Sequence, residues 1–189
     1  MITVVCGPMY ASKSTELVRR VRRLLVSGRT PLVVKPAIDD RYAKDAVVTH
    51  DGLLVPCSYV RSSEEVRSLA VMTGNEGTHA LRQHVFVDEA QFFDADIVHV
   101  TAWLSAMGVD VVLCGLDLDA MGNPFGPMAD LLCHADTVVK LTAVCSVCGK
   151  DATRTQRTAP WPSEKTGNID VGNAYEPRCV VHWKPTSEH

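Results

Sequence analysis

A glycine, a lysine and a serine close to the N-terminus have the spacing of a phosphate-binding loop. Residues 7–14 read Gly-Pro-Met-Tyr-Ala-Ser-Lys-Ser and match G-x-x-x-x-G-K-[ST] except at the second glycine. In such a loop, backbone N–H groups surround phosphate oxygens, the lysine neutralises the β- and γ-phosphates, and the hydroxyl binds Mg²⁺. Lys13 and Ser14 fill the last two roles, so these residues predict a site for a nucleoside triphosphate and magnesium.

The serine at position 12 is the one departure from that pattern. Glycine serves there because it accepts positive φ and lets a ligand approach the backbone closely. Serine is small, so we expect the loop to keep its shape if φ of Ser12 is negative. A chance match is the competing interpretation, and the strand and helix predicted on either side of the loop argue against it.

An acidic pair, Asp88 and Glu89, directly follows the apolar residues 85–87. Open α/β sheets bind their ligands at the carboxyl ends of buried strands, which is where this pair is predicted to lie. We expect Asp88 to help hold Mg²⁺ and Glu89 to accept the proton of an attacking hydroxyl. Without the phosphate loop, a solvated turn would be the preferred interpretation.

Two cysteine and histidine pairs lie towards the C-terminus. Cys145 and Cys148 form C-x2-C, and Cys179 and His182 form C-x2-H after 30 intervening residues. Four ligands of these types suit a closed, tetrahedral zinc site that stabilises a lobe too small to fold on its own core. The remaining cysteines are predicted to be buried thiols that act as small hydrophobic side chains. They are Cys6, Cys57, Cys114 and Cys133.

The composition of the 189-residue chain is that of a soluble globular protein. Hydrophobic residues make up 46% and charged residues 22%, with a net charge of -3, which argues against disorder and against a coat for nucleic acid. The N-terminus has no secretory leader and no long apolar run follows, so we expect a cytosolic protein without membrane spans. In a reducing compartment, clustered cysteines indicate metal ligands.

The arginines within 19–23 interleave with apolar residues and indicate the solvent-exposed face of an amphipathic helix.

The pattern of apolar residues places these motifs on an α/β fold. The apolar run 2–6 precedes the phosphate loop, helical spacing continues to Gly28, and 31–35 is predicted to be the next strand. Strand, helix and strand form a βαβ unit and predict a parallel sheet of the P-loop NTPase kind. Further elements are predicted as strands at 85–88, 109–114 and 138–141 and a helix at about 94–107.

The rest of the chain gives weaker signals. Residues 39–58 show little periodicity, and residues 72–80 are predicted to form an exposed loop. We expect a domain boundary near residue 142. Residues 1–141 then form the nucleotide-binding domain, and residues 142–189 form a small zinc-binding lobe.

Together the motifs resemble the thymidine kinase family of the zinc-containing, cellular and bacterial type. The segments Asp-Glu-Ala-Gln-Phe-Phe at 88–93 and Lys-Leu-Thr-Ala-Val-Cys at 140–145 add to the likeness, which spans nearly the whole chain. The resemblance implies that ATP is the phosphate donor, that zinc is structural, and that a lasso loop of the zinc lobe closes over a nucleoside. It also implies a homotetramer that takes part in nucleotide salvage.

The resemblance implies roles for individual residues as well. Glu89 falls on the family's catalytic base, and Arg41 falls where an arginine stabilises charge on the transferred phosphate. The residues implied for ATP and Mg²⁺ are Gly7, Met9, Tyr10, Ala11, Ser12, Lys13, Ser14, Thr15, Asp39, Asp88 and Gln91. The residues implied for the nucleoside are Met9, Phe92, Leu116, Phe125, Thr155, Val171, Gly172, Asn173 and Tyr175.

Thymidine is the substrate that the resemblance implies, with deoxyuridine as the next candidate. Four residues match the positions that surround the thymine methyl group: Met9, Leu116, Thr155 and Tyr175. Two features depart from the family besides Ser12. Ala120 stands where the family has phenylalanine, and the lasso, residues 169–175, is one residue shorter. We therefore expect an altered substrate range.

Two other functions fit some of these residues. One is a P-loop ATPase whose zinc ribbon binds nucleic acid or a partner protein, which predicts a basic zinc lobe. Acidic and basic residues nearly balance within 142–189, so the lobe does not have that character. The other is a nucleotide sensor that has lost catalysis through Ser12.

Overall fold

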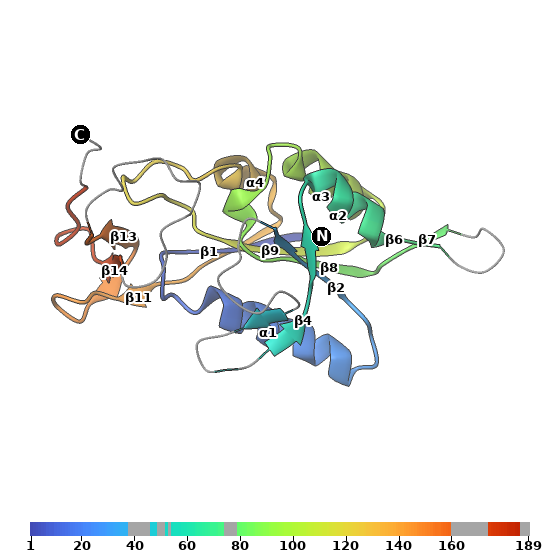
Figure 1. Cartoon of the computed structure of the whole chain (residues 1–189), viewed down its shortest axis with the longest axis horizontal. Helices are drawn as coiled ribbons and strands as arrows, with labels where there is room; N and C mark the ends of the chain where they lie inside the picture. The colour runs from blue at the N-terminus through green and yellow to red at the C-terminus, as the bar shows by residue number, and fades with distance from the viewer. Residues whose placement is uncertain (38–45, 49–51, 53, 74–78, 160–173, 186–189) are drawn as a thin grey trace.

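A six-stranded parallel sheet forms the centre of the molecule in the computed structural model (Figure 1), with strand order β10-β1-β9-β8-β2-β5. The structure describes residues 1–37, 46–48, 52, 54–73, 79–159 and 174–185. The strands of the sheet are β1 Ile2–Cys6, β2 Leu32–Pro36, β5 Ser58–Val60, β8 His84–Val87, β9 Asp110–Gly115 and β10 Thr137–Lys140. The sequence-based expectation of an α/β fold with a parallel sheet is confirmed.

Helices cover both faces of this sheet (Figure 1). They are α1 Lys13–Val26, α2 Ser63–Ala70, α3 Ile97–Ala106 and α4 Met128–His134. Alternate residues of each central strand enter opposite cores: Val87 packs with residues of α2, α3 and α4, whereas its neighbour Phe86 packs with Leu17 and Val21 of α1. Strands buried on both faces need apolar residues at successive positions, which is why these runs were readable in the sequence.

The first helix begins at Lys13, within the phosphate-loop motif, and ends where it was predicted to end. Its cap is Ser27, and Gly28 follows with φ of +76°. Arg19 and Arg20 both donate hydrogen bonds to Glu16, and the other two arginines of this helix are exposed. The arginines therefore form a solvated, ion-paired face.

Several short elements were not predicted. The edge strand β5, α2 and α4 are only 3, 8 and 7 residues long, too short for a clear periodicity. Two antiparallel strand pairs outside the main sheet lie in the described part of residues 46–81: β3 Ala46–Val48 with β4 Leu54–Pro56, and β6 Val71–Thr73 with β7 His79–Leu81. The prediction of a loop over 72–80 was therefore wrong at its ends, where the backbone pairs as strands.

The described part of the C-terminal lobe, residues 143–159 and 174–185, contains two small antiparallel pairs. These are β11 Ala143–Val144 with β12 Asp151–Ala152, and β13 Arg154–Arg157 with β14 Tyr175–Arg178. Its buried apolar cluster contains Cys145, Cys179 and two alanines of the lobe together with Ala11 of the phosphate loop. The lobe therefore packs directly on the phosphate loop.

The four cysteines outside the C-terminal pairs differ in burial. Cys6 and Cys114 are buried in the sheet, as predicted. The prediction was wrong for Cys133, which is exposed, and Cys57 is only half-buried. Cys133 lies two residues after the buried Leu131 on α4, and so lies off the face that this helix buries.

None of the helices within the described ranges is long and apolar enough to span a bilayer.

Candidate active site and metal centre

The phosphate loop connects β1 to α1 at the carboxyl end of the sheet. Gly7 has φ of +144°, and a Cβ atom there would lie 2.3 Å from the carbonyl oxygen of Leu141, so only glycine fits. Tyr10 and Ser12 have φ of 64° and 61°, which is the left-handed region. The expectation of a negative φ at Ser12 was wrong, because the chain takes a left-handed turn at the residue that leads into the helix.

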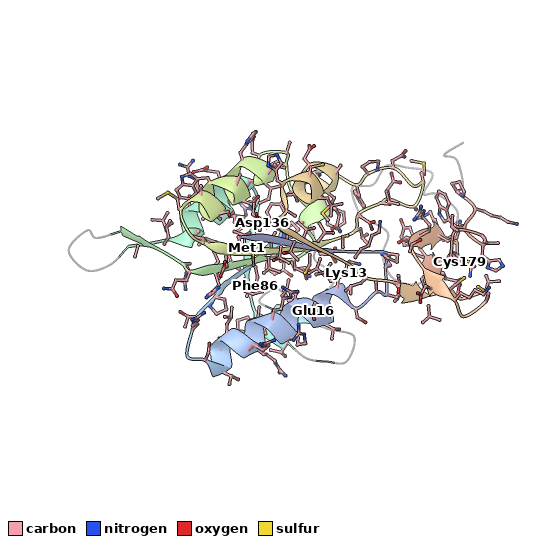
Figure 2. All side chains as sticks on the ribbon, turned by 180° about the vertical axis from the view of Figure 1, so that it is seen from behind. Met1, Lys13, Glu16, Phe86, Asp136 and Cys179 are labelled. Atoms are coloured by element: carbon pink, nitrogen blue, oxygen red, sulfur yellow. The ribbon has the colours of Figure 1, made fainter. Side chains whose placement is uncertain are left out.

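Lys13 lies at the first position of α1, between this helix and the sheet (Figure 2). Its Nζ donates a hydrogen bond to the carbonyl oxygen of Pro8 at 2.7 Å, within the loop itself. Burial lowers the pKa of Lys13, and the nearby negative charges of Glu89 and Asp88 act in the opposite direction. The structure thus brings the phosphate loop and the acidic pair together, although they lie 75 positions apart in the sequence (88 − 13).

The Glu89 carboxylate is held in place by a buried amide. Gln91 Nε2 donates to Glu89 Oε2 at 2.6 Å, and the backbone N–H of Leu116 donates to Gln91 Oε1 at 3.0 Å. A Cβ atom on Gly115 would lie 2.7 Å from the same Gln91 oxygen, so the amide fills the space beside β9. Glu89 itself has φ of 51° and is half-buried, whereas Asp88 is 4% exposed.

Two phenylalanine rings lie next to this acidic pair. Phe92 belongs to the short 3-10 helix Ala90–Phe92, and its ring meets that of Phe125 edge to face with centroids 5.4 Å apart. Gly126 follows with φ of +51°, and a Cβ atom there would lie 2.2 Å from the carbonyl oxygen of Gln91. Close backbone contact therefore fixes the segment after β9 against the segment after β8.

The C-terminal lobe reaches the same region. The backbone N–H of Met9 donates to the hydroxyl of Thr155 at 3.1 Å, and Thr155 is buried. In the adjoining strand, the Tyr175 hydroxyl accepts a hydrogen bond from Arg157 at 2.8 Å. The lobe therefore contributes polar groups beside the phosphate loop.

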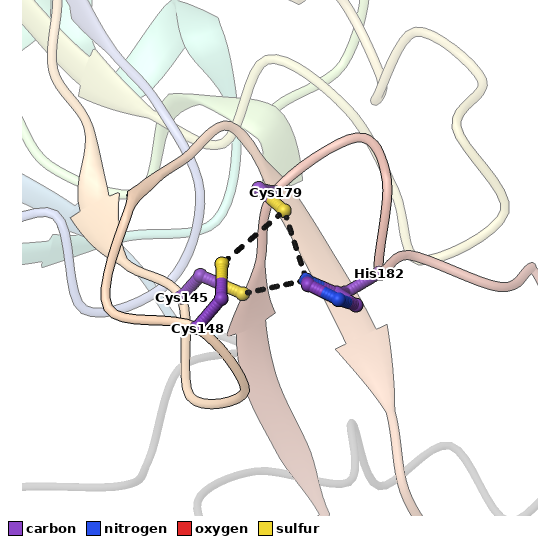
Figure 3. Close-up of side chains that lie close together, drawn as sticks. All are labelled: Cys145, Cys148, Cys179 and His182. Atoms are coloured by element: carbon purple, nitrogen blue, oxygen red, sulfur yellow. Dashed lines mark hydrogen bonds between the residues drawn. The ribbon is translucent and has the colours of Figure 1, made fainter.

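Three thiols and an imidazole converge in the C-terminal lobe (Figure 3). The ligand atoms of Cys145, Cys148, Cys179 and His182 all lie within 4.8 Å of one another, and Cys179 Sγ is 3.3 Å from His182 Nδ1. Burial raises the pKa of the Cys145 thiol. Hydrogen bonds from backbone N–H groups, that of Cys179 above all, outweigh this effect and lower the pKa to about 5. A lowered thiol pKa, within a set of three thiol sulfurs and one imidazole nitrogen, fits a structural zinc ion.

Comparison with known proteins bears on what this arrangement does. The family model described as thymidine kinase matches residues 1–183, which is nearly the whole chain. The chain belongs to the thymidine kinase family. A solved structure described as an ATPase is 11% identical over 75% of this chain, with a TM-score of 0.47. This chain covers 65% of that ATPase, just under two thirds of its length.

The structure of this thymidine kinase family member places most of the predicted site residues around one corner of the sheet. The phosphate loop, the acidic pair, the phenylalanine pair and Thr155 lie there together, as described above. Tyr10 is 42% exposed, and Ser14 and Thr15 are half-buried in the first turn of α1. The remaining predicted residues lie outside the described residues, so their roles stay predictions: Asp39, Arg41, Val171, Gly172 and Asn173.

Two features of the site were missed in the sequence. Lys140 Nζ lies 2.8 Å from the carboxylate of Asp117, which is 4% exposed and sits just after β9. The position of Asp117 at the carboxyl end of an apolar run was a usable signal, the same as that of Asp88. The contact of Trp183 with Ala120 left no signal in the sequence, because 63 positions separate these residues.

Proposed function

We propose that this protein is an ATP-dependent nucleoside kinase that phosphorylates the 5′-hydroxyl of thymidine, with deoxyuridine as a second substrate. Membership of the thymidine kinase family supports nucleoside phosphorylation as the class of reaction. The observation that carries the proposal is the Glu89 carboxylate, which Gln91 orients beside the lysine of the phosphate loop. A proton acceptor beside a predicted phosphate site supports the proposal, because transfer to a hydroxyl requires one.

In the proposed reaction, Glu89 accepts the proton of the nucleoside 5′-hydroxyl. At the same time, the 5′-oxygen of the nucleoside forms a bond to the γ-phosphorus of ATP. The bond from the γ-phosphorus to the β,γ-bridging oxygen breaks, and ADP leaves with that electron pair. Lys13 and the backbone N–H groups of residues 7–14 neutralise the phosphates, and Arg41 stabilises the charge that develops on the transferred group. Ser14 and Asp88 would hold Mg²⁺, which supplies further charge neutralisation.

We propose that the nucleobase lies beside the Phe92 and Phe125 rings, with Met9 and Thr155 near its methyl group. The Met9 to Thr155 hydrogen bond supports this, because it joins the loop that binds the donor to the lobe that covers the acceptor. Val171, Gly172, Asn173 and Tyr175 would complete the site from the lasso. Zinc would hold the lobe through Cys145, Cys148, Cys179 and His182, which form the cluster described above.

The sequence pattern supports two further proposals: a boundary between the nucleotide-binding domain and the zinc lobe near residue 142, and a location in the cytoplasm. Family membership supports two more: a homotetramer and a role in nucleotide salvage.

The assay that tests the proposed function follows the label of γ-³²P-ATP in the presence of thymidine, deoxyuridine or deoxycytidine. Label in thymidine monophosphate, with one ADP formed per nucleotide, is the expected result. Label released only as inorganic phosphate, above all when nucleic acid stimulates it, would favour the P-loop ATPase. ATP binding without any transfer would favour the sensor.

A further inference from the structure

Trp183 connects the C-terminal lobe to the loop that follows β9. Its indole Nε1 donates a hydrogen bond to the carbonyl oxygen of Ala120 at 3.3 Å. The ring also lies directly over Gly122, where a Cβ atom would come within 2.6 Å of Trp183 Cη2. Gly122 thus has no side chain where the indole lies, and Trp183 makes both a polar and a packing contact with this loop.

The loop that Trp183 contacts, residues 117–125, is closed on itself by hydrogen bonds. The N–H of Phe125 donates to the carbonyl oxygen of Asp117 at 3.1 Å, and the N–H of Asp119 donates to that of Asn123 at 2.9 Å. The Asp119 carboxylate accepts from the N–H groups of Met121 and Asn123. A loop with this many internal bonds moves as a unit, so a contact at its tip influences the position of Phe125 at its end.

Trp183 is itself firmly attached to the C-terminal lobe. Its backbone N–H donates to the carbonyl oxygen of Cys179 at 2.9 Å, and the guanidinium of Arg154 lies 5.7 Å from the centre of its ring. The next residue, Lys184, donates its N–H to the buried side chain of Gln156 at 2.7 Å. The lobe therefore holds Trp183 by its own backbone, by its ring and by the backbone of the next residue.

We propose that Trp183 is a positioning residue that fixes the 117–125 loop from the C-terminal lobe and so keeps Phe125 against Phe92 at the nucleoside site. The indole occupies the space that a side chain at position 122 would fill. The loop contact stands on the structure alone. Its effect on nucleoside binding rests on the proposed function, so the two are measured separately.

Hydrogen–deuterium exchange of the loop amides tests the contact without any catalytic assay. In Trp183→Ala, peptides that cover 117–125 should exchange about tenfold faster, while those of β1 and β9 stay unchanged, because local stability depends on local contacts. Trp183→Phe keeps part of the packing and should give an intermediate rate. Trp103→Ala removes a half-buried indole on α3 that packs under Arg67 of α2, and it should leave the loop unchanged.

A glycine pair gives a second variant that leaves the lobe intact. Gly122→Ala forces a methyl group against the indole, whereas Gly108→Ala meets nothing within 4 Å at a nearly equal φ, +83° against +86°. Both carry the same backbone strain, so faster loop exchange in Gly122→Ala alone is the expected result. Equal exchange in the two variants, or an unchanged loop in Trp183→Ala, would overturn the proposal.

Kinetics then test the link to the nucleoside site. In Trp183→Ala, the KM for thymidine should rise about tenfold, with the KM for ATP and the zinc content within about twofold of the parent, and Trp183→Phe should restore most of the loss. An equal rise in both KM values would contradict a role at the nucleoside site. If the parent phosphorylates no nucleoside, the kinase proposal fails, and the exchange measurements still decide the role of Trp183 in the loop.

Discussion

Backbone strain gathers on the residues of the candidate site. Among the described residues, the non-glycine residues with positive φ are Tyr10, Ser12 and Glu89. Two lie in the phosphate loop and the third is the proposed base. A left-handed conformation costs a non-glycine residue roughly 1–2 kcal/mol, and such residues gather where surrounding structure and function hold them in place.

Replacing Ser12 with glycine should therefore stabilise the fold. Ser12 is the N-cap of α1, but its side chain makes no capping hydrogen bond, so the substitution relieves strain without removing a bond. We expect the free energy of unfolding to rise by about 1 kcal/mol. Denaturant unfolding measures it, with Ser27→Gly as the control because Ser27 has φ of -81°. A loss of stability in Ser12→Gly would show that the serine side chain has a role the structure does not reveal.

Gln91 should matter for turnover because it orients the proposed base. Gln91→Ala removes the bond that orients Glu89 and leaves the Leu116 N–H without its acceptor. We expect kcat with thymidine to fall about ten- to a hundredfold, since misplacing a reacting group by even 1 Å is costly. Gln83→Ala, at an exposed amide, is the matched control. A change confined to the KM for ATP would instead place Gln91 at the donor.

Residue types and spacing predicted much of the site. Lys13, the acidic pair and the metal ligands were each readable because their chemistry depends on short-range spacing. The φ of Ser12 could not be predicted from the sequence, because it depends on how the loop turns into the helix. The contact of Trp183 with Gly122 depends on two segments that meet only through the tertiary fold.

At the scale of elements, the sequence predicted the long buried strands and missed the short pieces. Strands β1, β8 and β9 are apolar at successive positions because both faces are covered. The edge strand β5 has half-buried residues and only three positions, so tertiary pairing with β2 decides its structure.

The first turn of α1 should show a pH-dependent contribution to stability. Hydrogen bonds from Arg19, and then from Arg20, lower the pKa of Glu16 to about 2, below its ordinary value of 4.5. A lowered folded-state pKa stabilises the fold above pH 4.5, and that stability is lost as pH falls towards 2. Because the Arg19 side chain is 53% exposed and solvent screens its charge, we expect Glu16→Gln to cost under about 1 kcal/mol at pH 7.

Urea unfolding of this variant at several pH values measures the effect. The difference from the parent should shrink steadily below pH 4.5. Glu64→Gln is the control, because Glu64 is 69% exposed and lies 3.7 Å from Arg67. A Glu16 effect that does not vary with pH would show that the two arginines contribute through packing and not through charge.

The zinc cluster should determine the stability of the C-terminal lobe. Cys148→Ser removes one of four donors, and we expect the zinc content to fall below half an ion per chain and the Tm by about 5 °C or more. Cys133→Ser, at an exposed thiol outside the cluster, should change neither. Metal analysis and calorimetry give both values. Full zinc content in Cys148→Ser would remove this cysteine from the ligand set.

At the scale of the whole molecule, the candidate site lies where three parts of the chain meet. The sheet contributes the phosphate loop and the acidic pair, the segment after β9 contributes Phe125, and the C-terminal lobe contributes Thr155. Ala11 of the phosphate loop shares a buried cluster with Cys145 and Cys179 of the zinc site. The phosphate loop and the four-residue cluster of possible metal ligands therefore pack against each other, so we expect a change in the lobe to alter the phosphate loop.

The most direct test of this account is phosphate transfer by Glu89→Gln. The variant keeps the shape of the side chain but cannot accept a proton, so transfer of ³²P from ATP to thymidine should fall by about a hundredfold or more. ATP binding and zinc content should stay unchanged. Full turnover in Glu89→Gln would contradict the proposed role of Glu89 and, with it, the mechanism proposed for this site.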